Sequence, residues 1–162
     1  MSRTRVLLSL GSNLEPRAAR ITAAIEELRQ QALTDVVCSQ VYTTEPVGYI
    51  DQPDFLNVAV AGETSLSAEE LFVACKAIEQ TLGRQHRRQW REREIDIDIL
   101  LFGEETLLNE LLTIPHPRMH ERRFVLVPAA EIAPDMVDPT TLRTIGELLS
   151  ECTDTSRVTA VD

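Results

Sequence analysis

The sequence has few cysteines, no long apolar run and no excess of positive charge, and each shortage excludes a class of protein. Its three cysteines, Cys38, Cys75 and Cys152, are widely spaced and form no C-x-x-C pair. We therefore expect neither a disulfide framework nor a cysteine zinc site. We expect a protein of a reducing compartment. No stretch approaches the roughly 20 apolar residues of a membrane span, and the apolar start is too short for a secretory signal. We expect a cytoplasmic protein without a membrane partner.

The net charge of -10 argues against general nucleic-acid binding, because that activity requires a broad positive face. The basic residues are nevertheless clustered. One cluster spans residues 84–93 and contains Arg84, Arg87, Arg88, Arg91 and Arg93; a second contains Arg118, Arg122 and Arg123. In an acidic protein such clusters indicate either a small polyanionic ligand or a solvated loop held by salt bridges. Composition leaves both interpretations open.

The pattern of apolar residues predicts a single domain, residues 1–162, with an α+β fold. We predict strands at 6–10, 36–43, 55–61 and 95–102, and helices at 16–28 and 67–82. This is the βαββαβ order of ferredoxin-like folds, in which an antiparallel sheet carries both helices on one face. We expect the remainder to form a hairpin around Gly103 and short helices near 118–130 and 141–151.

Asp96 and Asp98 are the sharpest feature of the sequence, because residues two apart on a strand project from the same face. Two neighbouring carboxylates repel each other and favour a cation. Mg²⁺ takes oxygen ligands and often lies between carboxylates and substrate phosphates, and two such ions could clamp a phosphoryl transfer from both sides. The alternative is a solvent-facing pair of aspartates on an edge strand.

Other candidate ligand-binding residues lie on the third predicted strand and in the arginine-rich loop. Phe55 and Asn57 share a face, so a flat heterocycle could stack on the ring and be read by the amide. The preceding loop, 44–48, could offer backbone groups to the same heterocycle, although an aromatic residue in a strand is also a common core residue. Trp90 could equally cover a nucleotide or anchor its loop, whose guanidinium groups suit phosphate oxygens.

Four segments resemble the signature of the 6-hydroxymethyl-7,8-dihydropterin pyrophosphokinases, enzymes of folate biosynthesis. They are LGSNL at 10–14, DQPDFLN at 51–57, WREREIDIDIL at 90–100 and LTIPH at 112–116. Arg122, Phe124 and Pro128 continue the match, which covers about residues 5–138 in the right order. The resemblance implies a ferredoxin-like fold and transfer of the β,γ-pyrophosphate of ATP, the co-substrate, to the hydroxymethyl group of the dihydropterin, with release of AMP.

The resemblance also implies roles for individual residues. Two Mg²⁺ ions would be held by Asp96 and Asp98, and the catalytic residues would be Arg84, Arg93, Asp96 and Asp98. The pterin would contact Thr44, Pro46, Val47, Gly48, Phe55, Asn57 and Phe124. ATP would contact Glu79, Arg84, Trp90, Arg93, Ile99, Thr113, His116 and Arg122. No protein base for the acceptor hydroxyl is identified, and metal positioning with electrostatic stabilisation could suffice. Without the resemblance, His116 could equally be a loop histidine that the backbone satisfies.

The sequence departs from the family pattern at several positions. Arg91-Glu92 replaces a usual Gly-Pro, Pro117 replaces a familiar aromatic residue, and Leu111 stands where a basic residue can occur. The arginine-rich loop is one residue shorter than in some relatives, so either His86 or Arg87 could be the second lid residue. These departures keep open a second interpretation, a non-catalytic or specialised pterin- or nucleotide-binding paralogue.

An RNA-binding module of ferredoxin-like fold is a further alternative, since such sheets stack bases on aromatic side chains. The acidic net charge and the single aromatic platform, Phe55, argue against it. The expected partners are small-molecule substrates rather than nucleic acid, and a monomer is compatible with the sequence.

Overall fold

The computed structural model describes residues 2–85 and 92–161. Its main sheet contains β1 (Thr4–Ser12), β2 (Thr34–Cys38), β3 (Tyr42–Thr44), β4 (Phe55–Thr64), β5 (Asp96–Phe102) and β10 (Val158–Ala160). Two small hairpins pair β6 (Leu107–Leu108) with β7 (Thr113–Ile114) and β8 (Val137–Asp138) with β9 (Arg143–Thr144). The helices are α1 (Arg17–Gln31), α2 (Ala68–Thr81), α3 (Arg123–Ile132), α4 (Ile145–Glu151) and the 3-10 helix Met119–Glu121.

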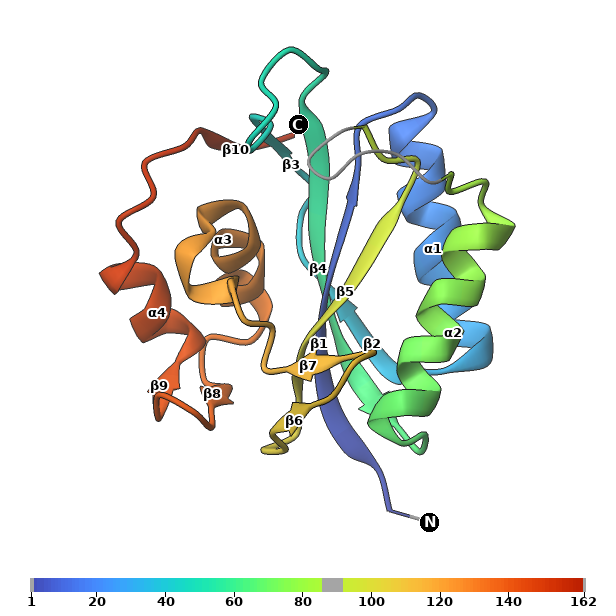
Figure 1. Cartoon of the computed structure of the whole chain (residues 1–162), viewed down its shortest axis with the longest axis vertical. Coiled ribbons are helices and arrows are strands. Elements are labelled where there is room, and N and C mark those ends of the chain that lie inside the picture. The colour runs from blue at the N-terminus through green and yellow to red at the C-terminus, as the bar shows by residue number, and fades with distance from the viewer. Residues whose placement is uncertain (1, 86–91, 162) are drawn as a thin grey trace.

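The main sheet is antiparallel and has the order β10-β3-β4-β1-β5, with β2 also paired to β4. Helices α1 and α2 cover one face, and α3 and α4 lie on the other (Figure 1). None of the helices in the described part of the chain is long and apolar enough to cross a membrane. The architecture is therefore a mixed α/β arrangement of three layers, with the sheet in the middle.

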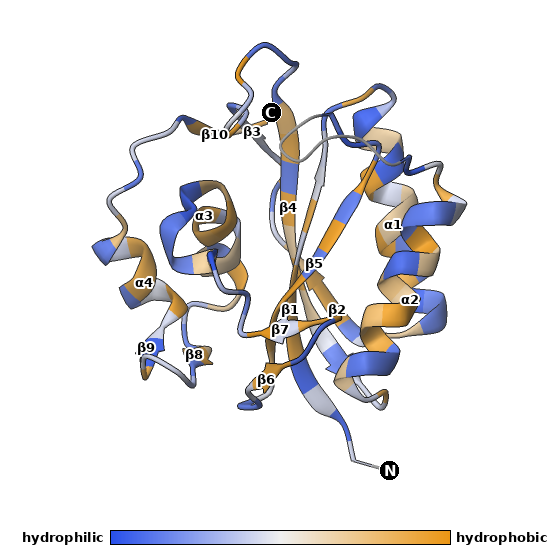
Figure 2. Ribbon diagram, in the orientation of Figure 1, coloured by the Kyte–Doolittle hydropathy of each residue, from blue (hydrophilic) through white to orange (hydrophobic). Residues whose placement is uncertain are grey.

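The two cores follow from the alternation of side chains along the central strand β1. Val6, Leu8 and Leu10 belong to the core beneath α1 and α2, whereas Leu7 belongs to the core beneath α3. In Figure 2 the apolar colouring of the helices is concentrated on the sides that face the sheet. After Leu7 the α3 face of β1 becomes polar or small, at Ser9 and Gly11, and this change leaves room for a site.

A bulge in β5 helps to place the acidic residues. The register with β1 shifts between Leu7, opposite Leu101, and Leu8, opposite Ile99, so that Leu100 has no partner. Leu100 and Leu101 both join the α3 core, whereas Ile97 and Ile99 join the other. The backbone N–H of His116 donates to the Leu100 carbonyl at 3.1 Å, which brings the 116 segment alongside β5.

The predicted helices at 16–28 and 67–82 are confirmed, and α2 begins with the expected Ser67–Glu70 capping box. The strand predicted at 36–43 is wrong in its continuity, because it is divided into β2 and β3. Ser39 lies at the break, where its hydroxyl takes the place of a backbone partner by accepting from the N–H of Ala59 at 2.9 Å.

The hairpin expected around Gly103 is wrong in position. Gly103 only ends β5, and the hairpin is formed by β6 and β7 around Asn109. The Asn109 side-chain oxygen accepts from the N–H groups of Leu111 and Leu112, both at 2.9 Å, and so fixes the turn. Strand β10 was not expected from the sequence, because its 3 residues are too few to show an alternation of apolar and polar side chains.

Helix α3 is attached to the sheet through Glu131. Its carboxylate accepts from the Tyr42 hydroxyl at 2.5 Å and from the backbone N–H of Gln40 at 3.0 Å. Burial of Tyr42, together with its hydrogen bond to the negatively charged Glu131, raises the pKa of Tyr42 to about 12. The bond therefore stabilises the fold fully below the ordinary tyrosine pKa and is lost as the pH rises through the folded-state value.

We predict that Tyr42→Phe lowers the free energy of unfolding by about 1 kcal/mol at pH 7, because one hydrogen bond is removed. Between pH 7 and pH 11 the free energy of unfolding should also decrease less in the variant than in the parent, because the variant has no Tyr42 hydroxyl to ionise. Urea unfolding at pH 7 and pH 11 measures both effects. An equal loss of stability between these pH values in the variant and the parent would contradict the assignment.

Candidate active site

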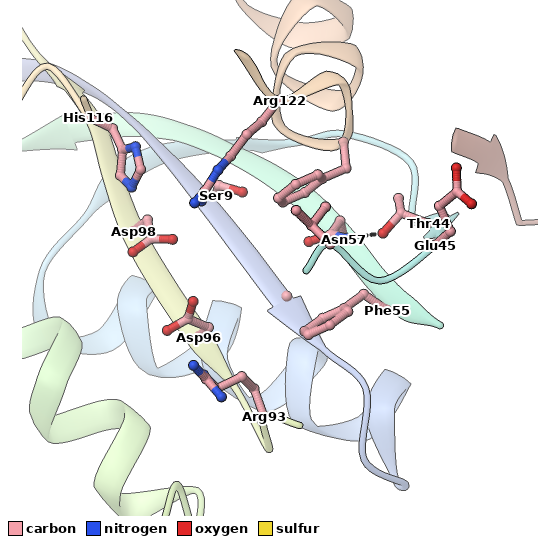
Figure 3. A pocket seen from close by; sticks show the side chains of 13 residues that line it. Ser9, Thr44, Glu45, Phe55, Asn57, Arg93, Asp96, Asp98, His116 and Arg122 are labelled. Atoms are coloured by element: carbon pink, nitrogen blue, oxygen red, sulfur yellow. Dashed lines mark hydrogen bonds between the residues drawn. The ribbon is translucent and has the colours of Figure 1, made fainter. Parts of the chain in front are cut away.

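A pocket of about 240 Å³ lies on the α3 face of the sheet, beyond the start of α3 (Figure 3). Its lining comes from β1, from the β3–β4 region, from Arg93 and the start of β5, and from the segment that leads from His116 into the first turn of α3. The lining residues are Ser9, Gly11, Thr44, Glu45, Val47, Phe55, Asn57, Arg93, Asp96, Asp98, His116, Arg122 and Phe124. The strands thus bring together most of the residues that the sequence indicated.

Asp96 and Asp98 project side by side from β5 into this pocket, as predicted (Figure 3). Asp96 lies opposite Gly11, and Asp98 lies opposite Ser9. Burial and the neighbouring charge of Asp96 raise the pKa of the Asp98 carboxyl. Both causes penalise the charged form, so a bound cation would stabilise the ionised pair.

The donor set of this pair suits a hard cation that shares its coordination with a ligand. In the described part of the chain no group of three or more acidic, histidine or cysteine side chains could enclose a metal. Two carboxylates leave coordination positions for phosphate oxygens and water, which is how Mg²⁺ is commonly held beside nucleotides. Asp96 and Asp98 therefore fit Mg²⁺ bound together with a phosphorylated substrate better than a metal enclosed by protein alone.

Two arginines flank the acidic pair. The Nη2 of Arg84 lies 3.8 Å from Oδ1 of Asp96, and its Nε is a buried donor without a hydrogen-bond partner among the described residues. Arg93 lines the pocket next to Asp96 (Figure 3). Guanidinium groups at this place can bind phosphate oxygens while the carboxylates bind a metal.

His116 lies next to Asp98 in the pocket (Figure 3). Its Nδ1 accepts from the backbone N–H of Arg118 at 3.2 Å. Burial and the positive charge of Arg122 lower the pKa of His116 to about 4. The imidazole is therefore neutral at pH 7 and carries its proton on Nε2, which makes it a hydrogen-bond donor rather than a cation.

Residues at the start of α3 form the wall opposite Phe55. The guanidinium carbon of Arg122 lies 5.7 Å from the centre of the Phe124 ring, within cation–π range. Burial lowers the pKa of Arg122, and the carboxylate of Asp98 acts in the opposite direction. Phe55 and Phe124 are thus two aromatic side chains in one pocket, one from β4 and one from α3.

Asn57 forms a buried polar wall between the two aromatic residues. Its Nδ2 donates to the Thr44 hydroxyl at 2.5 Å, and both side chains are almost fully buried. Gly11 lies directly opposite, where a Cβ atom would come within 2.6 Å of the Asn57 Oδ1. Only glycine at this position leaves the amide undisturbed.

Several of the predicted ligand-binding residues do not line the pocket. Ile99 is buried in the α1–α2 core, and Thr113 lines a neighbouring groove that also reaches His116. Pro46 and Gly48 belong to the β3–β4 loop, of which Glu45 and Val47 line the pocket. Trp90, His86, Arg87 and Arg91 lie outside the described residues.

Glu79 was predicted to contact ATP, and the structure places it on α2 behind the edge of β5. Its Oε2 accepts from the backbone N–H of Ile97 at 2.7 Å, and Lys76 Nζ lies 3.2 Å from Oε1. Burial raises the pKa of Glu79, whereas Lys76 and the Ile97 hydrogen bond lower it. In this arrangement Glu79 satisfies the free edge of the strand that carries the aspartates.

Sequence reasoning did not single out Asn13, which connects two segments of the site. Its Oδ1 accepts from the Arg93 backbone N–H at 2.7 Å, and its Nδ2 donates to Gln52 at 2.9 Å and to the Pro53 carbonyl at 3.0 Å. Asn13 belongs to the segment LGSNL at 10–14, which follows the first predicted strand and resembles the family signature. Such a segment predicts a loop but not the distant parts of the chain that it contacts.

We predict that Gly11→Ala displaces the Asn57 amide and breaks its bond to Thr44. The loss of one buried hydrogen bond should lower the free energy of unfolding by about 1–3 kcal/mol. Gly146→Ala is the matched control, because there an added Cβ meets nothing closer than 3.5 Å. Denaturant unfolding of both variants measures the difference, and equal stabilities would show that the Gly11 contact is not tight.

Comparisons with known proteins agree on one family. The family model described as 7,8-dihydro-6-hydroxymethylpterin-pyrophosphokinase matches residues 7–134. The chain is 43% identical over 148 residues to the 2-amino-4-hydroxy-6-hydroxymethyldihydropteridine pyrophosphokinase of Haemophilus influenzae, covering 91% of this chain and 92% of that protein. It is 47% identical over 126 residues to the enzyme of the same name from Bacillus subtilis, covering 77% and 75%.

Solved structures support the fold. A crystal structure of an HPPK-DHPS in complex with substrates superposes with a TM-score of 0.73 at 17% identity, and Plasmodium falciparum HPPK-DHPS with pteroate gives 0.73 at 18%. Each comparison covers 93% of this chain but only 43% of the longer protein. At this level of identity the likeness concerns the fold alone.

Proposed function

The chain belongs to the 7,8-dihydro-6-hydroxymethylpterin-pyrophosphokinase family, and we propose how the residues of its pocket carry out the reaction. The enzyme transfers pyrophosphate from ATP to the hydroxymethyl group of 6-hydroxymethyl-7,8-dihydropterin in folate biosynthesis. A bond forms between the hydroxymethyl oxygen and the β-phosphorus, the bond between the α,β-bridging oxygen and the β-phosphorus breaks, and AMP leaves. The observation that carries the proposal is the meeting of a carboxylate pair, Arg93, Arg122 and an aromatic–amide wall in one pocket.

Asp96 and Asp98 hold Mg²⁺ in this proposal, and we propose two ions. Bound Mg²⁺ would neutralise the phosphate oxygens and align the attacking and leaving oxygens. Support comes from the side-by-side projection of the carboxylates and from the raised pKa of Asp98. The role of the protein is to present both carboxylates from one rigid strand, so that the phosphate chain is held in a single orientation.

The dihydropterin is proposed to lie between Phe55 and Phe124, with its polar edge against Asn57. The Asn57 Nδ2 already donates to Thr44, so its Oδ1 remains the natural acceptor for an N–H of the ring. Gly11 keeps that oxygen free of contact with a side chain on β1. The β3–β4 loop, with Pro46, Val47 and Gly48, contributes backbone groups to the same edge.

The phosphate chain of ATP is proposed to lie between the acidic pair and the basic residues around it. Arg84 and Arg93 flank Asp96, and Arg122 lies across the pocket. Neutral His116 can donate from Nε2 to a phosphate or ribose oxygen without adding charge. Fixed donors of this kind stabilise charge that moves to the leaving AMP.

Four further residues are proposed to contact ATP, although they are not among the lining residues of the pocket. Glu79, Ile99 and Thr113 are proposed to border the nucleotide along the β5 edge and the adjoining groove, and Trp90 to cover it. No described side chain is assigned as the base for the acceptor hydroxyl. Alignment and electrostatic stabilisation supply most of the catalysis in phosphoryl transfers of this kind.

We also propose that the fold is ferredoxin-like and that one chain is sufficient for activity. The order β3-β4-β1-β5, with β2 beside β4, supports the first proposal, because it places the fourth strand of the βαββαβ series beside the first. The second is supported by the completeness of the set of groups that one chain supplies, which includes the carboxylate pair, the arginines and the aromatic–amide wall.

The predicted products test the proposed function. ATP, Mg²⁺ and the reduced pterin alcohol together should yield AMP, and omission of either the pterin or Mg²⁺ should abolish it. Chromatography of the nucleotides measures the outcome. Formation of ADP, or of AMP without the pterin, would refute the pyrophosphoryl transfer.

Variants extend the same assay to the metal ligands. Asp96→Ala and Asp98→Ala should each abolish AMP formation, whereas Asp135→Ala, which removes an exposed aspartate paired with Arg5, should leave it unchanged. Circular dichroism verifies that the fold is retained. Near-normal turnover in either pocket variant would remove that residue from the proposed metal site.

A further inference from the structure

The C-terminal segment 152–161 runs from α4 to the edge of the sheet, where β10 pairs with β3 (Figure 1). This segment lies beyond residues 7–134, which the family model matches. The residues that line the pocket all lie between Ser9 and Phe124. The segment nevertheless contacts the two walls of the pocket from outside, through Asp154 and Arg157.

Asp154 holds the start of α3. Its Oδ2 accepts from the backbone N–H of Arg123 at 2.9 Å, at the first residue of the helix. Ser156 orients this carboxylate by donating its N–H to Oδ1 at 2.9 Å and its hydroxyl to Oδ2 at 3.0 Å. Burial would raise the pKa of Asp154, but these hydrogen bonds outweigh it and lower the pKa. Arg123 stands between Arg122 and Phe124, which both line the pocket.

Arg157 holds both ends of the loop between β3 and β4. Its backbone N–H donates to Oε1 of Glu45 at 2.7 Å, at the beginning of the loop. Its Nη2 donates to Oδ2 of Asp54, also at 2.7 Å, immediately before Phe55. Arg157 therefore links the two ends of the loop from outside, in addition to the pairing of Thr44 with Phe55 at its base. Arg123 adds a link between the two attachments by donating from Nη1 to the Ser156 carbonyl at 3.1 Å.

We propose that Asp154 and Arg157 form a clasp that fixes the spacing between the wall carrying Phe124 and the wall carrying Phe55, and thereby sets the affinity for the pterin. Both are positioning residues, since neither lines the pocket. This inference rests on the proposed function, in which the pterin lies between the two aromatic rings. The acidic pair is carried by β5, whereas the clasp attaches to α3 and to the β3–β4 loop. Of the residues proposed to bind ATP, Arg122 adjoins Arg123, so ATP affinity should decrease through Arg122 and much less than pterin affinity.

The test is the dissociation constant of 6-hydroxymethyl-7,8-dihydropterin, measured by calorimetry with Mg²⁺ and a non-hydrolysable ATP analogue. Asp154→Ala and Arg157→Ala should each weaken pterin binding about threefold, and the double variant about tenfold. The affinity for the ATP analogue alone should change less than about twofold. Asp154→Asn and Arg157→Lys, which keep an acceptor and a cation respectively, should recover most of the loss.

Arg143→Ala is the matched control, because this arginine forms ion pairs with Glu147 and Glu151 of α4 and none of these residues belongs to the clasp. Unchanged pterin affinity in a folded double variant would overturn the inference. So would an equal loss of pterin and nucleotide affinity together with a lower melting temperature, since that result indicates a merely structural role. Pterin binding by the wild type without AMP formation would refute the proposed function alone, whereas absence of pterin binding would overturn both.

Discussion

The register of β1 against its two neighbouring strands is the constraint on which the site depends. It sets Ser9 opposite Asp98, and Gly11 between Asp96 and Asn57, all on one face of the sheet. A slip of one residue would turn these side chains into the α1–α2 core and bring leucines to the pocket. Because Val6, Leu8 and Leu10 are fully buried on the opposite face, such a slip is strongly disfavoured. The burial of these apolar side chains therefore stabilises the sheet and also keeps the polar side chains of the site on one face.

Charged groups are concentrated at one end of the pocket and neutral groups at the other. The carboxylates of β5 lie among arginines, which favours a metal with a phosphate chain, while the opposite end presents a neutral amide and two aromatic rings. The end with the amide and the aromatic rings suits a neutral heterocycle, because its hydration is weak and easily replaced. The end with the carboxylates would repel a polyanion unless a cation were bound there. In the proposed function, this polarity places the phosphate chain beside the hydroxymethyl group.

The local features of the fold could be predicted from the sequence, and the long-range ones could not. The period of apolar residues located α1, α2, β4 and β5, and the spacing of Asp96 and Asp98 indicated their common face. The break at Ser39 depends on a contact with β4, and the bulge at Leu100 depends on the pairing with β1. A local sequence pattern therefore does not predict either feature. Asn13, Asp154 and Arg157 act through partners 31 or more residues away, which a single sequence does not identify.

We propose that the carboxylates of β5 bind the divalent cations that accompany ATP. Electron paramagnetic resonance of Mn²⁺, titrated with a non-hydrolysable ATP analogue and the dihydropterin, counts these ions directly. We expect two bound ions per chain in the wild type, fewer in both Asp96→Asn and Asp98→Asn, and an unchanged number in Asp135→Asn. Two ions retained at full affinity in either pocket variant would contradict the proposal.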